Sequence, residues 1–143
     1  SQPAPPPQLT AEPLPRGSER ILLVEDELAV RTSLRRLLTR QGYTILEAAN
    51  GREAQQLYHR EQGKIDLLLT DIMMPEMGGR QLLAELRKHR PDLPALMVSG
   101  YDEEAVLARH PLPPRTVFVE KPFLLGTIVR VIRTLLDAPA HEA

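Results

Sequence analysis

The chain has 143 residues, 42% of them hydrophobic, which is enough for one domain with a sizeable core. It carries 18 Lys and Arg against 19 Asp and Glu, a net charge of −1, so we expect no general attraction to nucleic acid or anionic lipid. The absence of Cys excludes disulfides, thiolate metal sites and a Cys nucleophile. Its apolar runs are far too short to span a bilayer, and no signal-peptide pattern is visible. We therefore expect a cytoplasmic domain that makes no membrane contact.

Residues 1–19 are rich in proline, since six of the first 15 residues are Pro. This composition predicts an extended and mostly unpacked linker. At roughly 3 Å per residue, such a stretch can hold two domains up to about 45 Å apart. A disordered tail is the alternative. Residues 20–137 form the predicted domain, and residues 138–143 a C-terminal tail.

From Arg20 onward, short apolar runs alternate with longer segments of helical period, which is typical of strand–helix units with a parallel sheet. The predicted strands are 21–24, 44–48, 65–70, 95–99 and 116–120. The predicted helices are 28–41, 52–62, 79–88, 102–109 and 125–136, the fourth being cut short by the prolines that follow it. Unbroken apolar strands are covered on both faces, so the first and third strands are expected inside the sheet and the more polar second strand at an edge.

Polar side chains lie at the ends of four predicted strands. Glu25 and Asp26 end the first, Asp71 the third, Ser99 the fourth and Lys121 the fifth. Each has an ordinary structural explanation: Asp26 could cap the next helix, Asp71 and Ser99 could form turns, and Lys121 could be a solvated charge. Ligands of open parallel sheets bind beyond the carboxyl ends of the strands. The joint placement therefore favours one common site.

The predicted cluster of three carboxylates implies a cation, because clustered carboxylates repel one another without one. Imidazole ligation is not expected, because the four histidines are scattered over predicted helices and the tail: His59, His89, His110 and His141. An all-oxygen site with few protein ligands suits Mg²⁺ better than Ca²⁺. An ammonium beside a divalent ion would neutralise a phosphoryl group. Asp71 is then the natural nucleophile, since a carboxylate can form an acyl phosphate.

The segments ILLVEDE, LLLTDIMMPEMGG, LMVSGY and VFVEKPF resemble the receiver domains of response regulators in two-component signalling. The resemblance covers about residues 20–136 and includes Pro75 and Gly79, four and eight residues after Asp71. It implies an α/β, flavodoxin-like fold: a five-stranded parallel sheet in the order 2-1-3-4-5, flanked by five helices. It also implies that Asp71 is phosphorylated by a histidine kinase or a histidine phosphotransfer domain. Such a domain promotes its own phosphorylation without turning over a separate substrate.

The resemblance also assigns roles to the site residues. Glu25, Asp26, Asp71 and the backbone carbonyl of Met73 would bind Mg²⁺. Ser99 and Lys121 would contact phosphoryl oxygens. The Lys121–Pro122 peptide is expected to be cis, which would help aim the lysine.

Phe118 stands where the family has its switch aromatic, although an ordinary core role is equally open. Phosphorylation would draw Ser99 inward and let the Phe118 ring follow, which would change the interaction surface. A homodimer is a further possible partner, and the sequence does not reveal whether phosphorylation drives dimerisation. Because Phe118 has no hydroxyl, such a switch would work by packing alone.

Met73 gives rise to a kinetic hypothesis. It lies beside the expected site, where a polar side chain would position a water for attack on the phosphoryl group, and a thioether is only a weak acceptor. We therefore expect the phosphorylated state to live longer than in a Met73→Asn variant.

Three alternatives stay open. The preferred context is a receiver with no output domain of its own, within a larger chain such as a hybrid histidine kinase, and a stand-alone regulator is the close second. A phosphatase resembling the haloacid dehalogenases would also use an Asp nucleophile, Mg²⁺ and Lys, but Met73 stands where that family has a second Asp. A receiver-like module that is never phosphorylated is disfavoured by the intact Asp71, Lys121 and acidic pair.

Overall fold

The computed structural model describes residues 13–100 and 111–139. These residues form five strands and four helices: β1 (Arg20–Val24), α2 (Leu28–Arg40), β2 (Thr44–Ala48), α3 (Gly51–Arg60), β3 (Leu67–Asp71), α4 (Gly79–Arg87), β4 (Ala95–Ser99), β5 (Thr116–Glu120) and α6 (Leu125–Asp137). All strand pairs are parallel and the order is β2-β1-β3-β4-β5, which confirms the predicted α/β class and strand order. The fifth predicted helix, 102–109, lies outside the described residues. None of the four described helices is long and apolar enough to cross a membrane.

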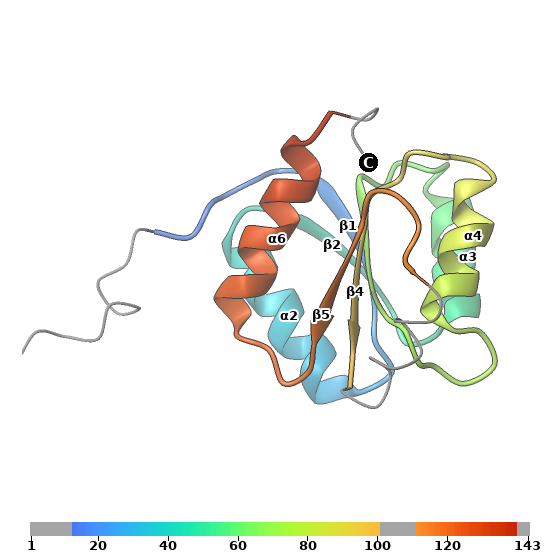
Figure 1. The fold of residues 1–143 in the computed structure, drawn as a ribbon, viewed down its shortest axis with the longest axis horizontal. Helices are drawn as coiled ribbons and strands as arrows, with labels where there is room; N and C mark the ends of the chain where they lie inside the picture. The colour runs from blue at the N-terminus through green and yellow to red at the C-terminus, as the bar shows by residue number, and fades with distance from the viewer. Residues whose placement is uncertain (1–12, 101–110, 140–143) are drawn as a thin grey trace, which may run out of the picture.

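Two helical layers enclose the sheet, with α2 and α6 on one face and α3 and α4 on the other (Figure 1). Successive side chains of a strand point to opposite faces. In β1, Leu22 therefore packs into the core beneath α3 and α4, whereas Ile21 and Leu23 pack into the core beneath α2 and α6. Strands β3 and β4 are buried at every position, as expected for inner strands covered on both sides. The predicted edge position of β2 is confirmed.

Local contacts explain where two elements begin. Asn50 caps α3 by accepting a hydrogen bond from Glu53 N at 2.9 Å, while Glu53 Oε1 accepts from Ala49 N at 3.0 Å. Together these two hydrogen bonds fix the start of the helix. Strand β3 begins two residues later than predicted, because Ile65 belongs to a turn in which its N–H bonds to Gly63 O at 2.8 Å. It also runs one residue further, so Asp71 is the last residue of β3 rather than the first residue of a loop.

Part of the predicted linker, residues 13–19, is described and lies against the domain. Gly17 N donates to Gln41 O at 3.0 Å, and Gln41 Nε2 donates to the carbonyl of Leu14 at 3.2 Å. Arg133 of α6 pairs with Glu19 at 2.6 Å. These residues are tied to α2 and α6, because their backbone groups and the Glu19 side chain find partners there.

Candidate functional site

Three carboxylates converge where β1 and β3 end. The two strands are neighbours in register, with Val24 opposite Thr70, so the residues that follow or end them lie side by side. One oxygen from each of Glu25, Asp26 and Asp71 lies within 4.8 Å of the others. Glu25 and Asp71 are buried, and Asp26 is exposed. The structure thus brings together the three carboxylates that the sequence placed at strand ends.

Lys121 reaches this cluster from the end of β5. Its Nζ lies 2.9 Å from Asp71 Oδ2 and 2.9 Å from Glu25 Oε1. Its backbone N–H donates to Ser99 O at 2.6 Å, and the Lys121–Pro122 peptide is cis, as expected. Burial alone would lower the pKa of Lys121, but its hydrogen bonds with Asp71 and Glu25 outweigh burial and raise that pKa. The interpretation of Lys121 as a free surface charge is therefore wrong.

Glu25 is held in place from several sides. Its Oε2 accepts from Glu27 N at 3.1 Å, and its backbone carbonyl accepts from Arg31 at 2.6 Å. Burial raises the pKa of the Glu25 carboxyl, and the hydrogen bond from Lys121 acts in the opposite direction. When all three carboxylates are ionised, a single ammonium does not balance them, which favours a bound cation.

Asp71 is positioned by the backbone around it. Its Oδ1 accepts a hydrogen bond from Met73 N at 3.2 Å, while its own carbonyl accepts from Thr70 Oγ1 at 3.0 Å. A Cβ on Gly79 would lie only 2.4 Å from that carbonyl, so the start of α4 must carry no side chain there. Thr70 was missed by sequence reasoning, since a Thr in a buried strand looks like an ordinary core residue.

Ser99 is fully buried at the end of β4, and its Oγ has no hydrogen-bond partner among the described residues. An unpaired buried hydroxyl is costly, so such an atom suggests a group that binds there. Ser99 and Asp71 both lie within strands, so neither forms a turn. Asp26 does not cap α2 either, because the capping position is Glu27.

The donor set fits Mg²⁺. Oxygens bound to one Mg²⁺ at about 2.0–2.1 Å lie at most roughly 4.2 Å apart. The carboxylate oxygens of the cluster, all within 4.8 Å of one another, need only small movements to reach that geometry. The Met73 side chain is 62% exposed, so its thioether takes no part in the core beside the cluster.

An apolar groove of about 490 Å³ opens beside Lys121, between the start of α2 and the segment leading into α6. Val30 and Leu34 of α2 line one side, and Phe123 and Leu125 the other. Two exposed leucines adjoin it in the chain: Leu28 is 65% exposed and Leu124 is 78% exposed. Large exposed apolar groups beside a polar site are typical of protein contact surfaces.

Phe118 of β5 is half-buried and packs against the core beneath α3 and α4. Its backbone partner in β4 is Met97, two residues before Ser99. The ring therefore lies on the same face of the sheet as α4, one strand away from Ser99.

Comparison with known proteins agrees with the fold. The family model described as the response regulator receiver domain matches residues 21–133, and the chain belongs to this family. The sensor kinase CckA of Brucella abortus (strain 2308) is 42% identical over 121 residues, which are 85% of this chain and 13% of that protein. The chain therefore spans only a small part of that relative.

Solved structures give the same picture. The crystal structure of the receiver domain from the hybrid histidine kinase CckA matches with a TM-score of 0.70 and 36% identity, over 82% of this chain and 99% of that one. The response regulator protein TrrA from Thermotoga maritima, solved in complex with Mg(2+)-BeF, matches with a TM-score of 0.70 and 30% identity. This match covers 82% of this chain and 99% of that one.

Proposed function

We propose that this chain is a phosphoacceptor: Asp71 takes a phosphoryl group, with Mg²⁺ bound, from the phosphohistidine of a histidine kinase or a histidine phosphotransfer domain. The observation that carries the proposal is the contact of Lys121 Nζ with both Asp71 and Glu25, at 2.9 Å each, inside a cluster of three carboxylates. The Asp71 carboxylate then reacts, while Lys121 and the other two carboxylates balance the charge at the site.

The transfer step requires little covalent chemistry from the protein. An Asp71 carboxylate oxygen attacks phosphorus, the new O–P bond forms, and the N–P bond of the donor breaks. The electron pair of that bond stays on the donor imidazole nitrogen, which then takes a proton from solvent. Lys121 pairs with a phosphoryl oxygen, and the unpartnered hydroxyl of Ser99 donates to another.

The metal site of the proposal consists of Glu25, Asp26, Asp71 and the backbone carbonyl of Met73. Mg²⁺ held by these residues would neutralise charge that builds up on the phosphoryl oxygens. The oxygen-only donor set supports this assignment, and so does the relative TrrA, whose solved complex contains Mg(2+)-BeF. Phosphorylation then draws Ser99 toward the phosphoryl group and lets Phe118 follow, which changes the surface that partners or a second copy contact.

The groove beside Lys121 supports docking of the donor protein. An exposed apolar groove next to the acceptor accommodates the apolar face of a donor helix, which brings its histidine to Asp71. The charged residues of the cluster act on the phosphoryl group. The apolar groove contacts the donor protein and therefore sets the specificity for the donor.

We further propose that this domain serves a hybrid sensor histidine kinase in the cytoplasm and has no output domain of its own. The 42% identity to CckA supports this context. A stand-alone regulator is the alternative, and the two differ in whether a kinase core occurs in the same natural chain.

Intact mass after incubation with Mg²⁺ and acetyl phosphate tests the acceptor site. We expect a metal-dependent gain of one phosphoryl group that disappears in Asp71→Asn. The matched control is Asp92→Asn, which removes a carboxylate paired with Arg90 outside the cluster. No gain under any condition would leave a binding module as the better account.

A further inference from the structure

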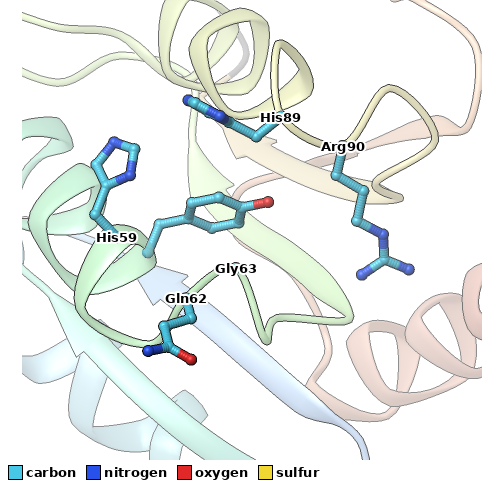
Figure 2. Close-up of a pocket in the computed structure, with 6 residues that line it drawn as sticks. His59, Gln62, Gly63, His89 and Arg90 are labelled. Atoms are coloured by element: carbon cyan, nitrogen blue, oxygen red, sulfur yellow. The ribbon is translucent and has the colours of Figure 1, made fainter.

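A second pocket, which is polar and has a volume of about 310 Å³, lies away from the carboxylate cluster. It is formed by the end of α3 and the turns that follow α3 and α4 (Figure 2). In a parallel sheet the helices run opposite to the strands, so helix ends lie at the edge where the strands begin. The lining residues are Tyr58, His59, Gln62, Gly63, His89 and Arg90. The transfer reaction proposed above uses none of them.

Two histidines that are distant in sequence meet at this pocket. The ring centroids of His59 and His89 are 5.2 Å apart, with the ring planes at 89°. Figure 2 shows the two rings turned toward each other from α3 and from the end of α4. The sequence left these histidines scattered over separate helices, because it does not reveal that α3 and α4 are neighbours on one face of the sheet.

The separation suits a shared metal ion. An imidazole nitrogen binds Zn²⁺ at about 2.0–2.1 Å, which places each ring centroid on the order of 3 Å from the ion and two such centroids roughly 5 Å apart at a tetrahedral angle. The observed 5.2 Å meets this requirement. Small rotations of the exposed side chains then aim one nitrogen of each ring at the ion.

Both rings are free to bind a ligand. Both side chains are exposed, and in residues 13–100 and 111–139 neither imidazole has a hydrogen bond or an ion pair. The buried ring of Tyr58 lies 6.0 Å from His59 and 6.2 Å from His89, and forms an apolar floor.

The local charge also suits a cation. His59 lies in the last turn of α3, and His89 directly follows the C-cap of α4, so the negative ends of two helix dipoles converge there. Arg90 does not oppose the ion at close range, since its guanidinium bonds to Ile65 O and pairs with Asp92. Figure 2 shows this side chain directed away from the two rings.

From this geometry we infer that His59 and His89 form a binding site for a divalent transition-metal ion of the class that prefers imidazole, such as Zn²⁺ or Cu²⁺. Water fills the remaining coordination positions. The site differs in chemistry from the carboxylate cluster, whose oxygen donors select Mg²⁺. A bound ion links the end of α3 to the end of α4.

Calorimetric titration of the untagged protein with Zn²⁺, in the presence of saturating Mg²⁺ to occupy the carboxylate cluster, tests this site. We expect one ion per chain, with an affinity that falls at least tenfold in His59→Asn and in His89→Asn. Gln56→Ala, which changes an exposed residue of α3 that does not line the pocket, serves as the control and should bind as the unaltered chain does. Circular dichroism of each variant establishes that it is folded.

Two results would overturn the inference: no Zn²⁺ binding beyond the carboxylate cluster, or unchanged affinity in a folded His59→Asn/His89→Asn double variant. Asp71→Asn separates this site from the acceptor, since that variant should lose phosphorylation and still bind Zn²⁺ at the two histidines.

Discussion

Lys121 Nζ lies 2.9 Å from Asp71 Oδ2, which brings the end of edge strand β5 into contact with the end of central strand β3. Strand β4 lies between them, and the cis Lys121–Pro122 peptide follows directly. The same ammonium contacts Glu25, so one side chain links three strand ends.

Replacing Lys121 by Gln should slow phosphorylation of Asp71 by acetyl phosphate roughly 100-fold or more, because a charged group aimed at the reacting oxygens is lost. The measurement is the rate of mass gain with saturating Mg²⁺. Lys88→Gln, which removes an exposed lysine paired with Glu85, is the control and should react normally. An unchanged rate in Lys121→Gln would contradict the role assigned to this lysine.

Asp26→Asn should weaken Mg²⁺ binding by about tenfold or more, since it removes one anionic ligand from the cluster. Asp26 is the cleanest choice among the three carboxylates, because it is exposed and forms no ion pair with Lys121. Calorimetric titration with Mg²⁺ provides the measurement. Asp137→Asn, at the end of α6, should bind Mg²⁺ as before. Equal affinity in Asp26→Asn would remove this residue from the metal site.

Met73→Asn should shorten the lifetime of phosphorylated Asp71. An amide at this exposed position can position the attacking water, and one hydrogen bond worth about 1 kcal/mol corresponds to a rate increase of several-fold. The decay of the phosphorylated mass after removal of acetyl phosphate measures the lifetime. Met73→Leu, which keeps the position apolar, should decay like the unaltered chain. Equal decay rates for the unaltered chain and the Met73→Asn variant would eliminate the hypothesis.

Gly79→Ala should destabilise the domain by about 1–3 kcal/mol, because the added methyl would overpack against a backbone carbonyl that cannot easily move. The new Cβ would lie 2.4 Å from Asp71 O. Gly100→Ala is a matched control near the same edge, where a Cβ meets no atom of the described residues within 4 Å. Urea denaturation compares the two variants, and equal midpoints would show that the close approach is not required.

The pair of Glu19 and Arg133 should make stability depend on pH. The hydrogen bond from Arg133 lowers the pKa of Glu19 from 4.5 to about 2. A carboxyl with a depressed folded-state pKa stabilises the fold above its unfolded-state pKa, and this contribution disappears as the pH falls from about 4.5 to 2.

Arg133→Gln should therefore cost about 1 kcal/mol at neutral pH, the upper range for a partly exposed pair. Denaturation midpoints recorded between neutral and acid pH should show the gap to the unaltered chain narrowing as Glu19 becomes protonated, and the part that remains belongs to the hydrogen bonds of Arg133 with Tyr43 and the Arg16 carbonyl. Arg130→Gln, on the exposed face of α6, is the control. A constant gap between the curves at all pH values would argue against the ion pair as the cause.

Much of the fold could be predicted from local patterns. The run Leu67, Leu68 and Leu69 identified an inner strand because a parallel strand covered on both faces must be apolar throughout. Glu25, Asp26, Asp71, Ser99 and Lys121 could be placed at one edge because parallel strands all end on the same side.

Other features depend on contacts between segments distant in sequence. The link between Lys121 and Glu25 joins residues 96 positions apart, and no local pattern encodes it. Residues 13–19 pack against partners in α2 and α6. Proline content does not reveal these partners, and it therefore predicted an unpacked chain. The meeting of His59 and His89 likewise depends on which helices share a face.

Locating the phosphoryl group on the chain shows directly whether Asp71 is the acceptor. The protein is incubated with Mg²⁺ and acetyl phosphate, reduced with borohydride to convert an acyl phosphate into a stable alcohol, and sequenced by tandem mass spectrometry. We expect homoserine at position 71, formed only when Mg²⁺ is present. Modification at another carboxylate, or none at Asp71 under any condition, would contradict it.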